Sequence, residues 1–265
     1  MISVVIDLAD ALPRMSASIQ GFSRAFGRAA RDGAVLEYDG VVASVAPAIP
    51  FRSIFNSAAF RDSRQLAAAL PRLAADYGAA GITAWGVWVH ESDQNGIAAI
   101  EAAGLRRDSE PTAMIAALDV FEAGTSGATK LEAAQDLEEF DRVLAAAYEF
   151  PPGVLVYCFP SLLDEFRGFV ARDPAGTAIC ALATVEVGGD CGVTLVGTAP
   201  EARGRGYASQ LILFALAEAR QRGCRTSTLQ ATRMGEAIYA RLGYCPFGAM
   251  ELWELRTAPD PTLGQ

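Results

Sequence analysis

Hydrophobic positions along the chain follow two different periods, which predict helices and strands in alternation. Apolar residues recur every three or four positions in five segments, which predicts helices over residues 63–77, 95–103, 131–148, 207–222 and 234–242. Short apolar runs predict strands over residues 2–6, 34–46 (two strands), 82–89, 112–118, 153–158, 168–172, 178–187, 192–196, 226–230 and 250–255. Asp39-Gly40 and Gly188-Gly189-Asp190 are typical hairpin turns. This order predicts an α/β or α+β fold with a mixed sheet.

A change of composition divides the chain near its middle. Residues 122–129 are small, polar and rich in glycine, which is typical of a linker between domains. The length of 265 residues fits one large domain or two of ordinary size. We therefore expect an N-terminal lobe over residues 1–122, a linker over 123–130 and a second domain over 131–257.

The charge of the chain bears on its partners. The formal net charge is −9, so no overall basic surface is available to neutralise nucleic-acid phosphates, and we expect no nucleic-acid partner. An acidic protein weakly favours a cationic small substrate. Hydrophobic residues make up 51% of the chain, which is ample for a packed core.

Cysteine and histidine usage argues against a metal site. The five cysteines form no CxxC pair and His90 is the only histidine, so we expect buried thiols in a reducing cytosol and no bound metal. The N-terminus lacks the basic region of a signal peptide, and no apolar run approaches the ~18 residues of a membrane span. We expect a cytoplasmic protein without a membrane partner, and the sequence leaves a homodimer open.

The segment that carries chemistry is residues 195–213, LVGTAPEARGRGYASQLIL. A strand ends there, a loop with two glycines and two arginines follows, and an apolar helix begins at once. Unpaired N–H groups and the helix dipole favour an anion at such a helix start, so the loop predicts a pyrophosphate site. An ordinary turn before a helix is the alternative. A Walker loop is excluded because no G-x-x-x-x-G-K-[ST] occurs, and the spacing fits a Rossmann fingerprint poorly.

Two motifs in this half resemble one known family. The run V-G-T-A-P-E-A-R-G-R-G-Y-A resembles the acetyl-CoA signature [RQ]-x-x-G-x-[GA] of the GNAT N-acetyltransferase superfamily, with Arg203, Gly206 and Ala208 at the signature positions. The later run L-Q-A-T-R-M-G-E-A-I-Y-A-R-L-G-Y resembles the family's strand–helix segment that ends in Y-x-x-x-G-[FY]. Thr232 departs from the pattern, since many relatives have Asn there, which puts a cofactor contact of that side chain in doubt.

The resemblance implies an N-acyltransferase that uses acetyl-CoA as cosubstrate and acylates a primary amine of a small molecule or a peptide. It implies that two strands separate near Val196 and that the cofactor is held by Leu195, Val196, Thr198, Arg203, Gly204, Arg205, Gly206, Tyr207, Ala208 and Ser209. Tyr239 matches the family's general acid, and a core aromatic is the alternative interpretation. Glu186 is the candidate general base, and an exposed hairpin carboxylate is the alternative.

The N-terminal half resembles an eroded copy of the same fold. Residues 82–118 repeat a strand, a short helix, an A-x-x-A-G-L phrase and a strand, but no cofactor signature precedes residues 63–77 and Ile100 stands at the Tyr239 spacing. This predicts two GNAT-like lobes in tandem with a degenerate first lobe, and an unrelated α/β lobe stays open. His90 is expected to be structural. A non-catalytic acyl-CoA-binding sensor or regulatory module is the alternative function for the whole chain.

Overall fold

The computed structural model describes residues 8–120 and 129–259, and its strands form one mixed sheet. The sheet has twelve strands in the order β1-β2-β3-β4-β12-β6-β11-β10-β9-β8-β7, with β5 paired to β12 beside this path. The predicted mixed α/β fold is therefore confirmed. The strand predicted over residues 2–6 and nearly all of the predicted linker lie outside the described residues.

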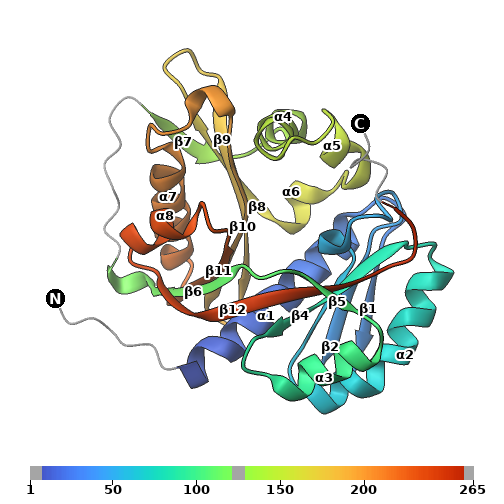
Figure 1. Cartoon of the computed structure of the whole chain (residues 1–265). Coiled ribbons are helices and arrows are strands. Elements are labelled where there is room, and N and C mark those ends of the chain that lie inside the picture. The colour runs from blue at the N-terminus through green and yellow to red at the C-terminus, as the bar shows by residue number, and fades with distance from the viewer. Residues whose placement is uncertain (1–7, 121–128, 260–265) are drawn as a thin grey trace.

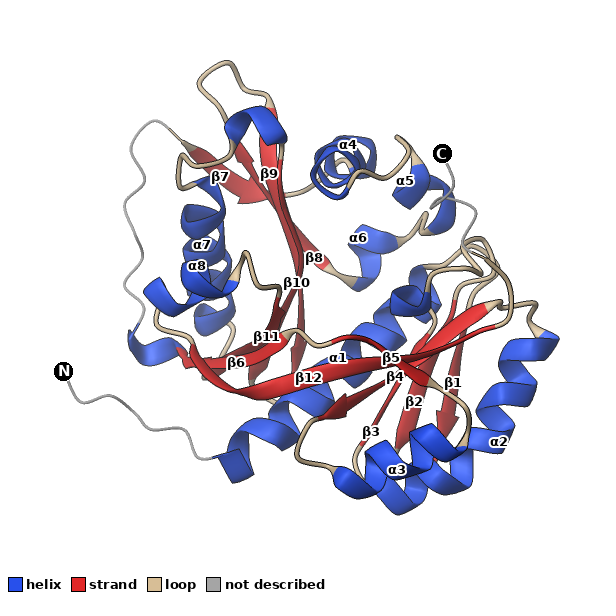
Figure 2. Cartoon of the chain, viewed as in Figure 1, coloured by secondary structure: helices blue, strands red, loops and turns tan. Residues whose placement is uncertain are grey.

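Strands β1 to β4 form the sheet of the first lobe (Figure 2). Its strands are β1 (Ala34–Tyr38), β2 (Val41–Val45), β3 (Ser57–Phe60) and β4 (Ala84–His90), and its helices are α2 (Ser63–Ala79) and α3 (Gln94–Ala102), with single turns η1 (Ser53–Phe55) and η2 (Leu118–Val120). The strands β3 and β4 are parallel, so α2 is the crossover between them.

The second lobe repeats this arrangement later in the chain. It contains β7 (Lys130–Ala133), α4 (Leu137–Tyr148), α5 (Val154–Cys158), α6 (Leu162–Glu165), β8 (Arg167–Arg172), β9 (Ala178–Val187), β10 (Asp190–Thr198), η3 (Pro200–Ala202), α7 (Tyr207–Gln221), β11 (Thr226–Ala231), α8 (Glu236–Arg241) and β12 (Cys245–Arg256). Here β10 and β11 are the parallel pair and α7 is their crossover.

The two lobes exchange strands. Strand β6 (Thr112–Ala117) belongs to the first half of the sequence but pairs with β11 and β12. Strand β12 begins beside β6 and then pairs along β4 and with β5 (Arg106–Ser109), so the last strand completes the first lobe (Figure 1). The division at residues 122 and 131 stays a prediction about folding units, because the sheet itself crosses that division.

Helix α1 (Leu8–Ala29) packs between the two lobes and was not predicted. Its apolar residues recur every three or four positions and are buried: Ala11, Met15, Ile19, Phe22, Phe26 and Ala29. All of them except Ala11 belong to one core with residues of α4 and α5. The buried carboxylate of Asp190 on β10 accepts hydrogen bonds from the hydroxyls of Ser18, Thr226 and Thr228. Because Ser18 lies on α1 and both threonines lie on β11, these bonds connect α1 to β10 and β11.

Several elements differ from the sequence prediction: β3, β5 and α6 were not predicted, and β12 begins five residues before the strand predicted over 250–255. The helix predicted over residues 131–148 begins only at Leu137, because Asp136 caps it by accepting from the amides of Glu138 and Glu139, and residues 130–133 are strand β7. The strand predicted over 153–158 is wrong, since α5 occupies it. Asp141 accepts from the amides of Gly153 and Leu155 and so fixes the start of this short helix.

Most other predicted elements are confirmed within one or two residues, and the cysteines are free. Cys245 is exposed, contrary to the expectation of buried thiols, because it begins β12 at the surface. Among the residues that the structure describes, no helix is long and apolar enough to cross a membrane. Within the same residues, no group of three or more His, Cys, Asp or Glu side chains could hold a metal ion.

Candidate functional site

The parallel strands of the second lobe separate before they end. Residues 190–192 of β10 pair with residues 226–228 of β11, yet β10 continues to Thr198 and β11 to Ala231. The separation that the resemblance implies near Val196 is therefore present, and it opens backbone groups of two strands toward the same space.

A bulge interrupts β10 where it leaves β11. The pairing with β9 shifts between Thr194 and Gly197, and Leu195 takes a left-handed backbone with φ of 52°. A non-glycine residue in that conformation costs roughly 1–2 kcal/mol, so neighbouring contacts must hold it. Leu195 packs against the core around α1 and α4, whereas Val196 packs against the core below α7. These adjacent side chains therefore lie on opposite faces of the sheet, as they do in a regular strand.

The C-terminal end of α4 contacts this bulge in two places. The Tyr148 hydroxyl donates to the carbonyl of Val196 at 2.9 Å. Gly197 lies so close to α4 that a Cβ there would be 2.7 Å from the Cβ of Ala147. The Tyr148 side chain is partly exposed, but desolvation around its hydroxyl, with the nearby Tyr239 hydroxyl, raises its pKa above the ordinary value, so the phenol remains a donor. Sequence reasoning placed Tyr148 only on the apolar face of a helix and missed this contact.

The loop between β10 and α7 has the backbone of an anion site. Gly204 and Gly206 have φ of 74° and 80°, which favours glycine, and a Cβ at Gly204 would meet nothing within 4 Å. No side chain caps the start of α7, whereas Asp62, Asp93 and Asp136 cap α2, α3 and α4. The N–H groups of this helix start therefore lack a capping side chain, which fits a phosphate.

The two arginines of the loop have different surroundings. Arg203 donates to the carbonyls of Thr198 and Ala147 at 3.2 and 3.0 Å, so it ties the loop to the bulge and to α4. Arg205 is exposed beside Gly204 and Gly206. Tyr207, Ala208 and Ser209 form the first turn of α7. All the residues expected to hold the cofactor therefore lie on one continuous segment at the bulged end of β10.

Tyr239 lies beside this end of β10. Its ring meets that of Tyr244 edge to face at 5.8 Å, and its half-buried hydroxyl lies near the Cys180 thiol. The same thiol accepts from the Thr198 hydroxyl at 3.2 Å, which connects Tyr239 to the strand that bears the bulge. Burial, with a smaller contribution from Cys180, raises the pKa of Tyr239 to about 12. The phenol therefore keeps its proton at neutral pH.

Glu186 does not join this group. It pairs with Cys191 on β10, five residues before Val196, which corresponds to about 16 Å along a strand. Its carboxylate accepts from Arg222 at 2.7 Å and lies 3.6 Å from Arg167. This geometry favours the alternative of a hairpin carboxylate, although Glu186 is half-buried and paired with arginines rather than exposed.

The first lobe has the same order of elements without the anion site. Helix α2 follows β3 as α7 follows β10, but the Asp62 carboxylate accepts from the Arg64 amide at 2.8 Å and pairs with the Arg64 guanidinium. A negative group thus occupies the start of α2, where it would repel a phosphate. Ile100, at the Tyr239 spacing, is fully buried.

Comparison with protein families gives one match. Residues 131–247 match the model of the acetyltransferase (GNAT) domain. This range contains the bulge, the glycine loop, α7 and Tyr239, and members of the family generally use an acyl-CoA. A search of curated proteins finds no match to the chain.

Solved structures with a similar fold extend over both lobes. A GCN5-related N-acetyltransferase from Kribbella flavida aligns with a TM-score of 0.66 at 17% identity and covers 95% of this chain and 97% of its own. A GCN5-related N-acetyltransferase from Sphaerobacter thermophilus aligns at 0.57 and 18% identity, covering 83% of this chain and 78% of its own. A tandem GNAT protein from the clavulanic acid biosynthesis pathway aligns at 0.55 and 15% identity, covering 83% and 79%. At these identities the likeness is one of fold.

Proposed function

We propose that this chain is an N-acetyltransferase, because residues 131–247 match the model of the acetyltransferase (GNAT) domain. It transfers the acetyl group of acetyl-CoA to a primary amine of a small molecule or a peptide. The chain is a tandem protein in this proposal, with catalysis in the second lobe and a degenerate first lobe.

One observation carries the proposal: the uncapped start of α7 lies directly after the bulged end of β10, where β10 has left β11. An uncapped helix start and glycines at positive φ suit a pyrophosphate. Beyond residue 192 the backbone of β10 does not pair with β11. An extended ligand chain that contains amide groups can pair with this backbone as an added strand would. A CoA ester has both parts in that order.

The roles of the residues follow from this placement. Backbone groups of Leu195, Val196 and Thr198 bind the pantetheine arm, and the amides from Gly204 to Ser209 bind the pyrophosphate, since the Arg203 amide donates to the Pro200 carbonyl. The amide of Val196 stabilises the oxyanion that forms when the amine attacks the thioester carbonyl. The Tyr148 hydroxyl supports this by fixing the carbonyl of Val196.

Tyr239 acts as the general acid in this mechanism. The departing CoA thiolate needs a proton, and the half-buried phenol keeps one because its pKa is raised to about 12. Its position near Cys180 and Thr198 supports the role.

Glu186, the candidate general base, lies away from the bulge. It would have to act through a chain of waters over about 16 Å, and its carboxylate is already paired with Arg222 and Arg167. We therefore propose that the acceptor enters the site as a neutral amine, or loses its proton to water, before it attacks the carbonyl.

A two-part experiment tests the function. Calorimetry compares the affinity of the whole chain for acetyl-CoA, ATP and NAD, and a screen of amines with acetyl-CoA measures release of free thiol. We expect acetyl-CoA to bind most tightly and thiol release to depend on the amine. Tight acetyl-CoA binding without release by any amine would favour a non-catalytic acyl-CoA sensor instead. Tighter binding of ATP or NAD would overturn the assignment.

A further inference from the structure

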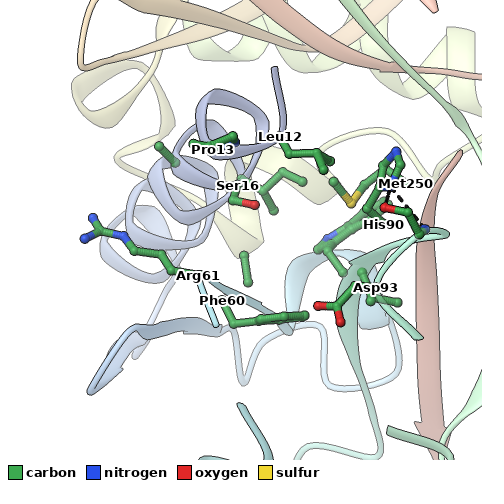
Figure 3. A pocket seen from close by; sticks show the side chains of 14 residues that line it. Leu12, Pro13, Ser16, Phe60, Arg61, His90, Asp93 and Met250 are labelled. Carbon is green, nitrogen blue, oxygen red and sulfur yellow. Dashed lines mark hydrogen bonds between the residues drawn. The ribbon is translucent and has the colours of Figure 1, made fainter. Parts of the chain in front are cut away.

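A cavity of about 460 Å³ lies in the first lobe, away from the site described above (Figure 3). Its walls come from the start of α1, the ends of β3 and β4, the turn before α3, and Met250 of β12. This volume is in the range of small-ligand pockets.

The cavity occupies the position that corresponds to the catalytic site of the second lobe. Strands β3 and β4 pair only at Ser57–Gly86 and Ala58–Val87, and the residues that follow on both strands line the cavity. In the first lobe, as in the second, a space lies where two parallel strands, here β3 and β4, separate. Since Asp62 caps the adjacent helix start, a ligand for this space carries no phosphate there.

One carboxylate in the wall lacks a cationic partner. Asp93 is half-buried and accepts from the Ser63 hydroxyl at 2.7 Å and the Gly96 amide at 2.8 Å. A carboxylate accepts about four hydrogen bonds, so it has capacity for further donors. In residues 8–120 and 129–259 it forms no ion pair, and in Figure 3 the Arg61 side chain extends away from it.

The other polar wall group is already satisfied. One ring nitrogen of His90 accepts from the Ser92 amide at 3.2 Å, and the other donates to the carbonyl of Phe247 at 3.0 Å. Both ring nitrogens of His90 thus have hydrogen-bond partners, which fits the structural role that the sequence predicted.

The rest of the lining is mostly apolar and partly aromatic. Phe60 lies next to Asp93, with Leu12 and Met250 across the cavity (Figure 3). Ile19 and the half-buried ring of Trp88 extend the apolar wall. Aromatic side chains beside a carboxylate that caps α3 and forms no ion pair among the described residues are a favourable environment for an organic cation.

We propose that this cavity is a binding site for a small organic ammonium ion with an apolar body. The ammonium group donates to Asp93, and the apolar body lies against Phe60, Trp88, Leu12 and Met250. The site requires neither CoA nor the catalytic residues, so the proposal is independent of the proposed function.

Calorimetry on the whole chain without CoA tests it, with 2-phenylethylamine as the cationic probe and 3-phenylpropionate as its anionic counterpart. Asp93→Asn keeps the shape and capping ability of the side chain but removes the charge. Ser16→Phe fills the cavity from α1. Glu101→Gln removes one charge from the exposed face of α3 and serves as the matched control.

We expect one amine per chain, little binding of 3-phenylpropionate, a loss of about tenfold or more in amine affinity for Asp93→Asn and Ser16→Phe, and no change for Glu101→Gln. A thermal melt and the acetyl-CoA affinity of each variant show that the fold and the second lobe are intact. If Asp93→Asn does not fold, Ser16→Phe alone decides. Absence of amine binding, equal binding of the anion, or wild-type affinity in the folded variants would overturn the proposal, whatever the result for acetyl-CoA.

Discussion

Replacing Gly206 by Asp tests the anion site at the start of α7. Gly206 has φ of 80°, and a Cβ there would meet only Gln210 Nε2 at 3.8 Å, so a side chain has room. The left-handed backbone costs a non-glycine residue roughly 1–2 kcal/mol, and Asn and Asp bear this cost most easily. Gly206→Asn is therefore the matched control, with the same shape and backbone but no charge.

The difference between the two variants isolates the charge. A carboxylate about 5 Å from one phosphate charge is repelled by roughly 3 kcal/mol at an effective dielectric constant of 20 and by roughly 0.8 kcal/mol in bulk water. The site is exposed on one side and lined by protein on the other, and a pyrophosphate carries more than one charge. We therefore expect at least ~2 kcal/mol, or about 30-fold weaker binding of acetyl-CoA to Gly206→Asp than to Gly206→Asn.

Titration calorimetry measures both affinities, and thermal melts check that both variants fold. The difference should shrink at high salt, because the site is open to solvent and its charges are screened. Equal affinities in the two folded variants, within about threefold, would show that no phosphate lies at this helix start.

Three further predictions concern the second lobe and the number of sites. Tyr239→Phe should lower kcat by roughly 10²–10⁴-fold while acetyl-CoA affinity stays nearly unchanged, and a variant within about threefold of wild type would remove Tyr239 from the mechanism. Because the acid acts while protonated and its pKa is raised to about 12, its contribution is lost only as pH rises through that value. The rate should therefore show no Tyr239-dependent fall between about pH 8 and about pH 10, and a fall in that range that disappears in Tyr239→Phe would contradict this. Acetyl-CoA should saturate at one equivalent per chain, since Asp62 occupies the start of α2, and saturation at two equivalents would refute a degenerate first lobe.

The sequence predicted the local elements of the site better than the architecture around them. The strand–loop–helix of residues 195–213 could be predicted because glycines and arginines occur there together with a change in the period of the apolar residues. The exchange of β6 and β12 between the lobes could not be predicted. Thr112–Ala117 is an apolar strand, and it could pair with the edge strand of either lobe. Pairing partners depend on the whole sheet, and no local pattern encodes them.

Helix α1 and the segment 153–158 were missed for different reasons. The spacing of Met15, Ile19, Phe22 and Phe26 was a sufficient signal for α1, although Pro13 and Gly21 lower its helix propensity. In residues 153–158 the β-branched Val154 and Val156 favour a strand, and the distant Asp141 overrides them by accepting from two amides. The Tyr148 contact and the surroundings of Glu186 also depend on tertiary structure, so neither could be inferred from the sequence.

The measurement that tests the central claim most directly is transfer of an isotope-labelled acetyl group from acetyl-CoA to an amine, followed by mass spectrometry of both products. The wild-type chain should yield acetylated amine and free CoA in equal amounts, and Gly206→Asp should require much more acetyl-CoA to reach the same rate. Saturating acetyl-CoA binding with no labelled product from any amine in a broad panel, or free CoA released without acetylated amine, would contradict an N-acetyltransferase.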